Sequence, residues 1–134
     1  MESYSWGQLQ WRWTVNSDGS GEFISTAPRS KDFNDRSVIT RHWNAATGRF
    51  NEVSELLSSV ESYADKALPC TKAIYDLPYG NVAWSRDGKK RVVNFDLGCR
   101  SIEVDRLYTQ MAAAYGLASK WAGGAATDRP APGQ

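Results

Sequence analysis

The fold is decided by the stretch that begins and ends at the two cysteines of this chain, Cys70–Cys99, which reads CTKAIYDLPYGNVAWSRDGKKRVVNFDLGC. Two runs with the composition of strands, Asn81–Ser85 and Arg91–Leu97, are joined through Asp87-Gly88. An Asp-Gly pair tolerates the positive φ angles of a type I′ turn, which suits the twist of a β-hairpin. The stretch therefore predicts a hairpin at the centre of the fold.

A two-residue turn also fixes the register of this hairpin. It places Trp84 opposite Arg91 and Val82 opposite Val93. Because side chains alternate along a strand, one face of the hairpin is then apolar and the other polar. The apolar face comprises Val82, Trp84, Val93, Phe95 and Leu97.

Residues before the hairpin predict a short lead-in strand at Lys72–Tyr75, brought alongside by a turn at Leu77–Gly80. Cys70 and Cys99 then lie at the outer ends of adjacent strands, at distances compatible with a disulfide. A disulfide implies an oxidising compartment, so we expect a periplasmic or secreted protein of bacterial type. The alternative is a reduced cytoplasmic protein whose cysteines pack as small apolar residues.

The first six residues, MESYSW, have neither a positively charged n-region nor an apolar h-region, so they encode no signal peptide. Export therefore requires a native leader that is absent from this sequence. No stretch approaches the roughly 20 apolar residues of a membrane-spanning helix, and we expect no insertion into a membrane.

A length of 134 residues suits one domain that can bury a sizeable core. We assign residues 1–124 to this single domain and expect residues 125–134, which contain two prolines and little apolar surface, to be a disordered tail. Sixteen basic and fifteen acidic residues give a net charge of +1. This balance lacks the excess of Lys and Arg that nucleic-acid binders use, so no nucleic-acid partner is expected.

The rest of the chain predicts three further strands and two helices. Alternation of apolar and polar residues indicates strands at Gln8–Asn16 and Glu22–Thr26, and β-branched residues indicate another at Ser37–Trp43. Apolar residues recur at helical spacing from Thr47 to Ala64. They recur again after Ser101, a plausible N-cap, until Gly123-Gly124 ends the helix.

These elements predict an α+β fold. We expect an antiparallel sheet of about five to six strands with two amphipathic helices packed on one face, in the order βββα-βββα. The two halves also suggest a duplication, because WGQLQWRW at residues 6–13 loosely matches YGNVAWSR at residues 79–86.

Residues that could carry chemistry are sparse. The single histidine, His42, has no neighbouring motif that supplies an orienting carboxylate and a nucleophile. Asp76 and Asp96 lie near Lys and Arg residues, and surface charge pairing explains them better than an acid–base pair. No nucleophile elbow, zinc-ligand motif or phosphate loop is present. We therefore assign no catalytic residue, no metal site and no cofactor.

The six tryptophans are an unusual load for this length, and most must be buried to keep the protein soluble. Aromatic and basic residues nevertheless interleave in the two matching stretches described above, residues 6–13 and 79–86. Aromatic side chains at the ends of elements can line a surface for a sugar ring, an apolar ligand or a protein. The weak ligand- or partner-binding residues are Trp6, Tyr79, Trp84 and Arg86.

Three functional hypotheses follow. The leading one is a small non-enzymatic protein of the cell envelope or exterior that binds a partner protein or small ligand through a rigid sheet. A second is a module that binds carbohydrate or another small ligand through exposed tryptophans. A third is a hydrolase with a dispersed site built from His42, Asp76 and Asp96. The sequence predicts neither the ligand nor the oligomeric state.

Overall fold

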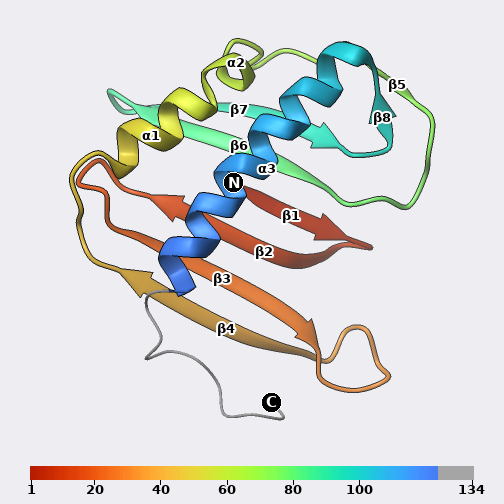
Figure 1. The fold of residues 1–134 in the computed structure, drawn as a ribbon. Coiled ribbons are helices and arrows are strands. Elements are labelled where there is room, and N and C mark those ends of the chain that lie inside the picture. Colours follow the sequence, from red (N-terminus) through yellow and green to blue (C-terminus); the bar gives the residue numbers. More distant parts are fainter. Residues whose placement is uncertain (124–134) are drawn as a thin grey trace.

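Six antiparallel strands form one sheet in the computed structural model, which describes residues 1–123 (Figure 1). The strand order across the sheet is β4-β3-β2-β1-β6-β7. β4 and β7 are therefore its two edges, and β1 lies inside it. The six strands are β1 (Glu2–Ser5), β2 (Gln8–Val15), β3 (Gly21–Pro28), β4 (Arg36–Trp43), β6 (Tyr79–Arg86) and β7 (Lys89–Asp96).

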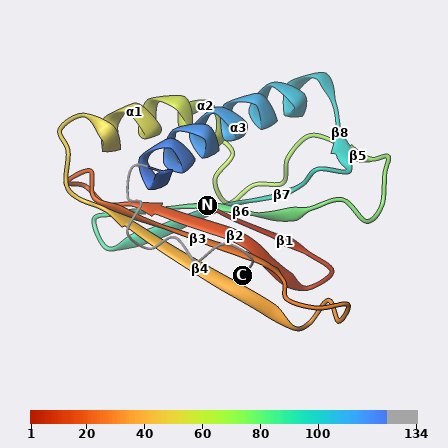
Figure 2. The ribbon, with the colours of Figure 1, turned by 60° about the horizontal axis from the view of Figure 1, so that its bottom comes forward.

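All helices of the described chain lie over one face of this sheet, and no helix covers the other face (Figure 2). They are α1 (Arg49–Leu56), α2 (Ser58–Glu61) and α3 (Ile102–Gly123). A separate two-stranded sheet joins β5 (Thr71–Lys72) to β8 (Cys99–Arg100). The class predicted from the sequence, α+β with an antiparallel sheet of about five to six strands, is confirmed, and the sheet has six.

The hydrophobic core fills the space between the sheet and the helices. Every second residue of the central strands enters it, as strand alternation requires. The sheet contributes Trp13, Phe23, Trp43, Val82, Trp84, Val93 and Phe95. The helical side contributes Val53, Leu57, Val60, Ala64, Leu107, Met111, Ala114, Ala118, Trp121 and Ala122.

The β6–β7 hairpin has the predicted turn and register. Asp87 and Gly88 have φ angles of 51° and 75°, so both lie in the left-handed region that a type I′ turn requires. Trp84 pairs with Arg91 and Val82 with Val93. The apolar face of this hairpin consequently points into the core.

β1 was not predicted, and it changes the architecture. It pairs antiparallel with β2 on one side and with β6 on the other, so β2 and β6 run in the same direction. β1 is thus the strand that joins the β4-β3-β2 group to the β6-β7 pair by hydrogen bonds. The predicted order βββα-βββα is wrong, because the first half supplies four strands of the large sheet and the second half supplies two.

Three other differences concern short segments. The predicted strand Lys72–Tyr75 is wrong, because only Thr71–Lys72 is a strand and it pairs with β8 instead of the hairpin. The single helix predicted over residues 47–64 is interrupted at Leu57, where α1 gives way to α2. The two halves of the chain contribute different numbers of strands to the large sheet, so the structure gives no basis for the suggested duplication. The tail predicted at residues 125–134 lies outside the described residues.

Candidate functional site: a cleft where β1 begins

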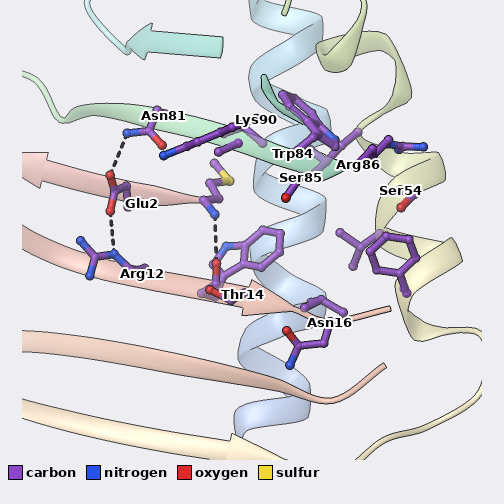
Figure 3. Close-up of a pocket in the computed structure, with 18 of the residues that line it drawn as sticks. Glu2, Arg12, Thr14, Asn16, Ser54, Asn81, Trp84, Ser85, Arg86 and Lys90 are labelled. Atoms are coloured by element: carbon purple, nitrogen blue, oxygen red, sulfur yellow. Dashed lines mark hydrogen bonds and ion pairs between the residues drawn. The ribbon is translucent and has the colours of Figure 1, made fainter. Parts of the chain in front are cut away.

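A cleft of about 520 Å³ opens between β2 and β6, beyond the start of β1 (Figure 3). It exists because β1 has four residues whereas β2 and β6 have eight each, so the two longer strands continue without a strand between them. Residues 12–17 and 81–86 form the two sides, and α1 and Leu57 lie over the end. The volume falls within the ~300–1,000 Å³ typical of ligand pockets.

Met1 forms the end of this cleft next to β1. Its amino group donates a hydrogen bond to the carbonyl oxygen of Trp13 at 2.9 Å, and the Trp13 N–H donates to the Met1 carbonyl oxygen at 2.9 Å. Burial disfavours the charged ammonium and lowers its pKa from 8.0 to about 6. The nearby Glu2 carboxylate opposes this shift without cancelling it.

In a protein whose chain starts at Met1, we expect this amine to make the folded state less stable as the pH falls from 8 to 6. The unfolded chain, with an amine pKa near 8.0, binds more protons in this window than the folded chain, with a pKa of about 6. The free energy of unfolding should therefore fall by about 2 kcal/mol from this group alone. Urea denaturation at pH 6 and pH 8 measures it, with Nα-acetylated protein as the control. An equal pH dependence in the acetylated protein would contradict the assignment.

Glu2 holds the start of β1 against both neighbouring strands. Its carboxylate accepts a hydrogen bond from Arg12 Nε at 2.6 Å and another from Asn81 Nδ2 at 2.8 Å (Figure 3). Burial opposes ionisation of Glu2, but the bonds from Asn81 and Arg12 outweigh burial and leave its pKa below the usual value. Glu2 also raises the pKa of Arg12. The charges of Glu2 and Arg12 are therefore paired with each other within the sheet.

The interior of the cleft is apolar and its outer rim is polar. Trp13 and Trp84 are buried in its walls, and Val53 of α1 is buried at its end. On the uncovered face of the sheet the rim carries Thr14, Ser85 and Lys90, a composition that suits an amphipathic ligand. The buried indole Nε1–H of Trp13 has no hydrogen-bond partner within residues 1–123.

The four predicted binding residues do not form one site. Trp84 and Arg86 line the cleft, and Arg86 Nη2 donates a 2.9 Å hydrogen bond to Glu61 Oε1. Tyr79 lies at the other end of the same strand, five residues and roughly 17 Å from Trp84. Trp6, with 70% of its surface exposed, is in the β1–β2 turn. These residues therefore fall into two groups at opposite ends of β6.

The group containing Trp6 is an aromatic cluster at the β1–β2 turn. Tyr79 stacks on Tyr4 with ring centroids 6.0 Å apart, and the Tyr79 hydroxyl accepts a 3.0 Å hydrogen bond from the Gly7 N–H. Trp6 has a φ of 52°, which is unusual for a bulky residue. The turn thus carries an exposed indole at Trp6, and its next residue, Gly7, is bonded to Tyr79.

The residues of the hydrolase hypothesis are not brought together. His42 lies on edge strand β4, where its Nδ1 is 3.5 Å from Glu22 Oε2, and Asp96 lies on the opposite edge strand, β7. Five strand spacings, or about 24 Å, separate the two edges. Asp96 forms an ion pair with Lys72 at 3.1 Å, and Asp76 lies in the segment between β5 and β6. This hypothesis therefore gains no support from the geometry.

Sequence reasoning missed Met1, Glu2 and Asn81. The only sequence signal for β1 was the mild alternation in Glu2–Ser5, and this alternation does not reveal that two distant strands flank β1. The predicted disulfide, in contrast, is present: Cys70 and Cys99 are bonded, with their Cα atoms 5.4 Å apart. Within the described residues no cluster of three or more His, Cys, Asp or Glu side chains is arranged to hold a metal ion.

Among the described residues, none of the helices combines the length and the apolar character that a membrane span needs. Comparisons of the whole chain with protein-family models, curated proteins and solved structures found no match. The cleft and the cluster at the β1–β2 turn are therefore the two candidate binding sites of the described residues.

Proposed function

We propose that this protein acts by binding a partner in the cleft between β2 and β6, without catalysing a reaction. One observation carries the proposal: the cleft joins buried apolar walls to a polar rim at the point where the sheet loses its central strand. Two of the charged groups at this point, Glu2 and Arg12, are paired with each other, and Glu2 is also bonded to Asn81. Such a site is built to hold a ligand.

The compartment is part of the same proposal. The Cys70–Cys99 disulfide supports a periplasmic or secreted location, since reducing compartments keep thiols reduced. When the purified wild-type protein is denatured without reductant and alkylated, neither cysteine should be labelled. Labelling of both residues would contradict both the disulfide and the oxidising compartment.

Photo-crosslinking tests where the partner binds. Ser85, which is exposed on the rim, is replaced by p-benzoylphenylalanine, and Val38, which is 63% exposed on edge strand β4, serves as the matched control. We expect an adduct of defined mass from position 85 and none from position 38. With the identified partner purified, Ala83→Trp should weaken binding at least tenfold, whereas Val38→Trp should not. Equal adducts at both positions, or turnover that depends on His42, would overturn the proposal.

A second candidate function is favoured by the exposed indole of Trp6. An exposed aromatic ring at this turn, where Gly7 is bonded to Tyr79 of the stacked Tyr4–Tyr79 pair, can stack on a sugar ring or another flat apolar ligand. Titration with a glycan panel should quench tryptophan fluorescence in the native protein and not in Trp6→Ala, which removes little buried surface. Quenching that survives in Trp6→Ala would contradict a site at this turn.

A further inference from the structure

We propose that this protein docks on the surface of a zwitterionic lipid bilayer through one end of its large sheet, with no segment crossing the bilayer. We call this surface the apolar end. It consists of the β1–β2 turn (residues 6–7), the β3–β4 connection (residues 29–35), the β5–β6 connection with Tyr79 (residues 73–79) and the start of α3. The inference goes beyond binding in the cleft, because the cleft lies at the other end of β6.

Strand pairing brings these segments to the same side of the molecule. β1 and β3 end here, and β2, β4 and β6 begin here, because each neighbouring pair of these strands is antiparallel. The small sheet continues the same end, since the N–H groups of Ala73 and Ile74 both donate to Gly98 O. Figures 1 and 2 both show the three connections and the start of α3 on one side.

The exposed large apolar side chains of the described residues gather at this end. Seven such side chains are exposed, and six of them belong to the apolar end, whereas Val38 lies two residues into β4. The connections at the opposite end of the sheet, residues 16–20, 44–48 and 87–88, carry none of them. The six are Trp6, Phe33, Ile74, Tyr75, Tyr79 and Ile102. Scattered exposed apolar side chains need no explanation, but their concentration on one surface marks an interaction site.

Hydrogen bonds hold the turn that carries Trp6. Trp6 has a φ of 52°, a left-handed conformation that a bulky residue keeps only where its surroundings enforce it. The Gly7 N–H donates to the Tyr79 hydroxyl at 3.0 Å. Gln8 Nε2 donates to Asn34 Oδ1 at 2.6 Å, which joins the turn to the β3–β4 connection. The exposed indole therefore stands on a fixed support.

The distribution of these side chains favours a bilayer over a folded protein. They stand on separate connections, and none of the six lines the cleft or a second cavity between α2 and α3. Tight protein interfaces, in contrast, seat their anchor residues in well-packed pockets. A fluid bilayer needs no matching pocket, and Trp and Tyr are the side chains that collect at the level of its headgroups. Trp6, Tyr75 and Tyr79 are of these two types.

The charges at this end complement zwitterionic headgroups. Residues 29–36, 72–79 and 96–105 contain five basic and six acidic side chains. Lys72 Nζ is 3.1 Å from Asp96 Oδ2, and Arg100 Nε is 2.6 Å from Asp105 Oδ1. Anionic membranes attract an excess of Lys and Arg, which this end lacks. A headgroup with one cation and one anion, as in phosphatidylcholine, matches its balanced charge.

Cosedimentation with phosphatidylcholine vesicles tests the docking. We expect the bound fraction of the native protein to rise with lipid concentration and to change less than about twofold between low and high salt. Adding phosphatidylserine to the vesicles should not increase it. Trp6→Asn should weaken binding about tenfold, because a Trp side chain would lose its apolar surroundings. Asn tolerates a positive φ, so this variant should keep the native Tm.

A relocated indole provides the matched control. Thr47 is exposed between β4 and α1, at the opposite end of the sheet. The double variant Trp6→Asn/Thr47→Trp therefore has the native number of tryptophans, and it should bind vesicles as weakly as Trp6→Asn. Phosphatidylcholine brominated in its acyl chains should quench the emission that Trp6 adds to the native protein. It should not quench the relocated indole.

A second connection tests whether the whole end docks. Tyr75→Ser should weaken vesicle binding about fivefold. Its effect and that of Trp6→Asn should multiply in the double variant, because the two side chains are on different connections and contact the same bilayer. An unchanged affinity of Tyr75→Ser would contradict docking through the whole apolar end.

The other outcomes also decide the inference. No cosedimentation of the native protein, or equal binding by Trp6→Asn, would overturn it, and so would binding that requires phosphatidylserine and disappears in salt. A dimer that light scattering detects in the native protein and not in Trp6→Asn would identify a second copy as the occupant instead. Quenching by glycans without vesicle binding would leave Trp6 to the second candidate function and refute docking on a bilayer.

Discussion

Replacing both cysteines by serine should lower the free energy of unfolding by about 3.5 kcal/mol. The disulfide joins residues 29 positions apart, and this closed loop contains the whole β6–β7 hairpin. Without the bond the unfolded chain gains the entropy of an open loop. The Tyr108 hydroxyl, 2.6 Å from Asp96 O and 2.7 Å from Cys99 O, still ties α3 to this corner, so we expect the double variant to fold.

Urea denaturation of Cys70→Ser/Cys99→Ser against the oxidised native protein measures the loss, and Tm should fall by roughly 10 °C. The native protein treated with reductant should behave like the double variant, and reductant should not change the double variant itself. A loss below about 1 kcal/mol would show that the bond does not constrain the unfolded chain as proposed.

Trp43→Ala should cost still more, about 3–5 kcal/mol. Trp43 is a buried residue at the end of β4, and its ring centroid lies 5.9 Å from that of Trp121 on α3. Its indole Nε1–H donates a 2.8 Å hydrogen bond to Gly19 O in the β2–β3 turn. Gly21 lies directly against the same ring, so the backbone of β3 is fitted to this side chain. Truncation would leave a cavity between sheet and helix.

The control for this prediction is Trp43→Phe, which keeps an aromatic ring and loses the bond to Gly19. It should cost about 1–2 kcal/mol, clearly less than the alanine variant. Both free energies come from urea denaturation at one pH, with m-values compared to exclude a change in the unfolded state. Equal losses in the two variants would mean that the hydrogen bond, and not the packing against Trp121, dominates the contribution of Trp43.

Sequence patterns predicted the parts of this fold that local geometry determines. The register of β6–β7 follows from the Asp87-Gly88 turn, since two residues with positive φ leave one possible pairing of the flanking strands. The start of α3 follows from Ser101, whose hydroxyl accepts a 3.0 Å hydrogen bond from the Val104 N–H. In both cases the decisive contacts lie within a few residues along the chain.

Non-local contacts determined the parts that the patterns missed. β1 is a strand because β2 and β6 lie on either side of it, and Asn81, which pairs with Glu2, is distant in the sequence. The segment at Lys72–Tyr75 has the composition of a strand, yet past Lys72 the N–H groups of Ala73 and Ile74 both donate to Gly98 O. A helical period cannot show the interruption at Leu57, because apolar spacing continues through it.

The candidate site was predicted only in fragments for the same reason. Trp84 and Arg86 were singled out, but the cleft they line depends on where β1 begins, which composition does not reveal. Trp6 and Tyr79 were grouped with them because aromatic and basic residues interleave in these stretches, whereas the fold places Trp6 and Tyr79 at the other end of β6. Chain topology, and not residue type, separated the two groups.

The interior position of β1 has a consequence for the time course of biosynthesis. β1 is made first, but Asn81, its partner on β6, follows 79 residues after Glu2. At ribosomal rates of about 5–20 residues per second, one edge of β1 waits roughly 4–16 s before β6 emerges. Throughout this interval a nascent chain exposes an open strand edge that any neighbouring chain could join. This edge is therefore where a chaperone would protect the chain best before the sheet closes.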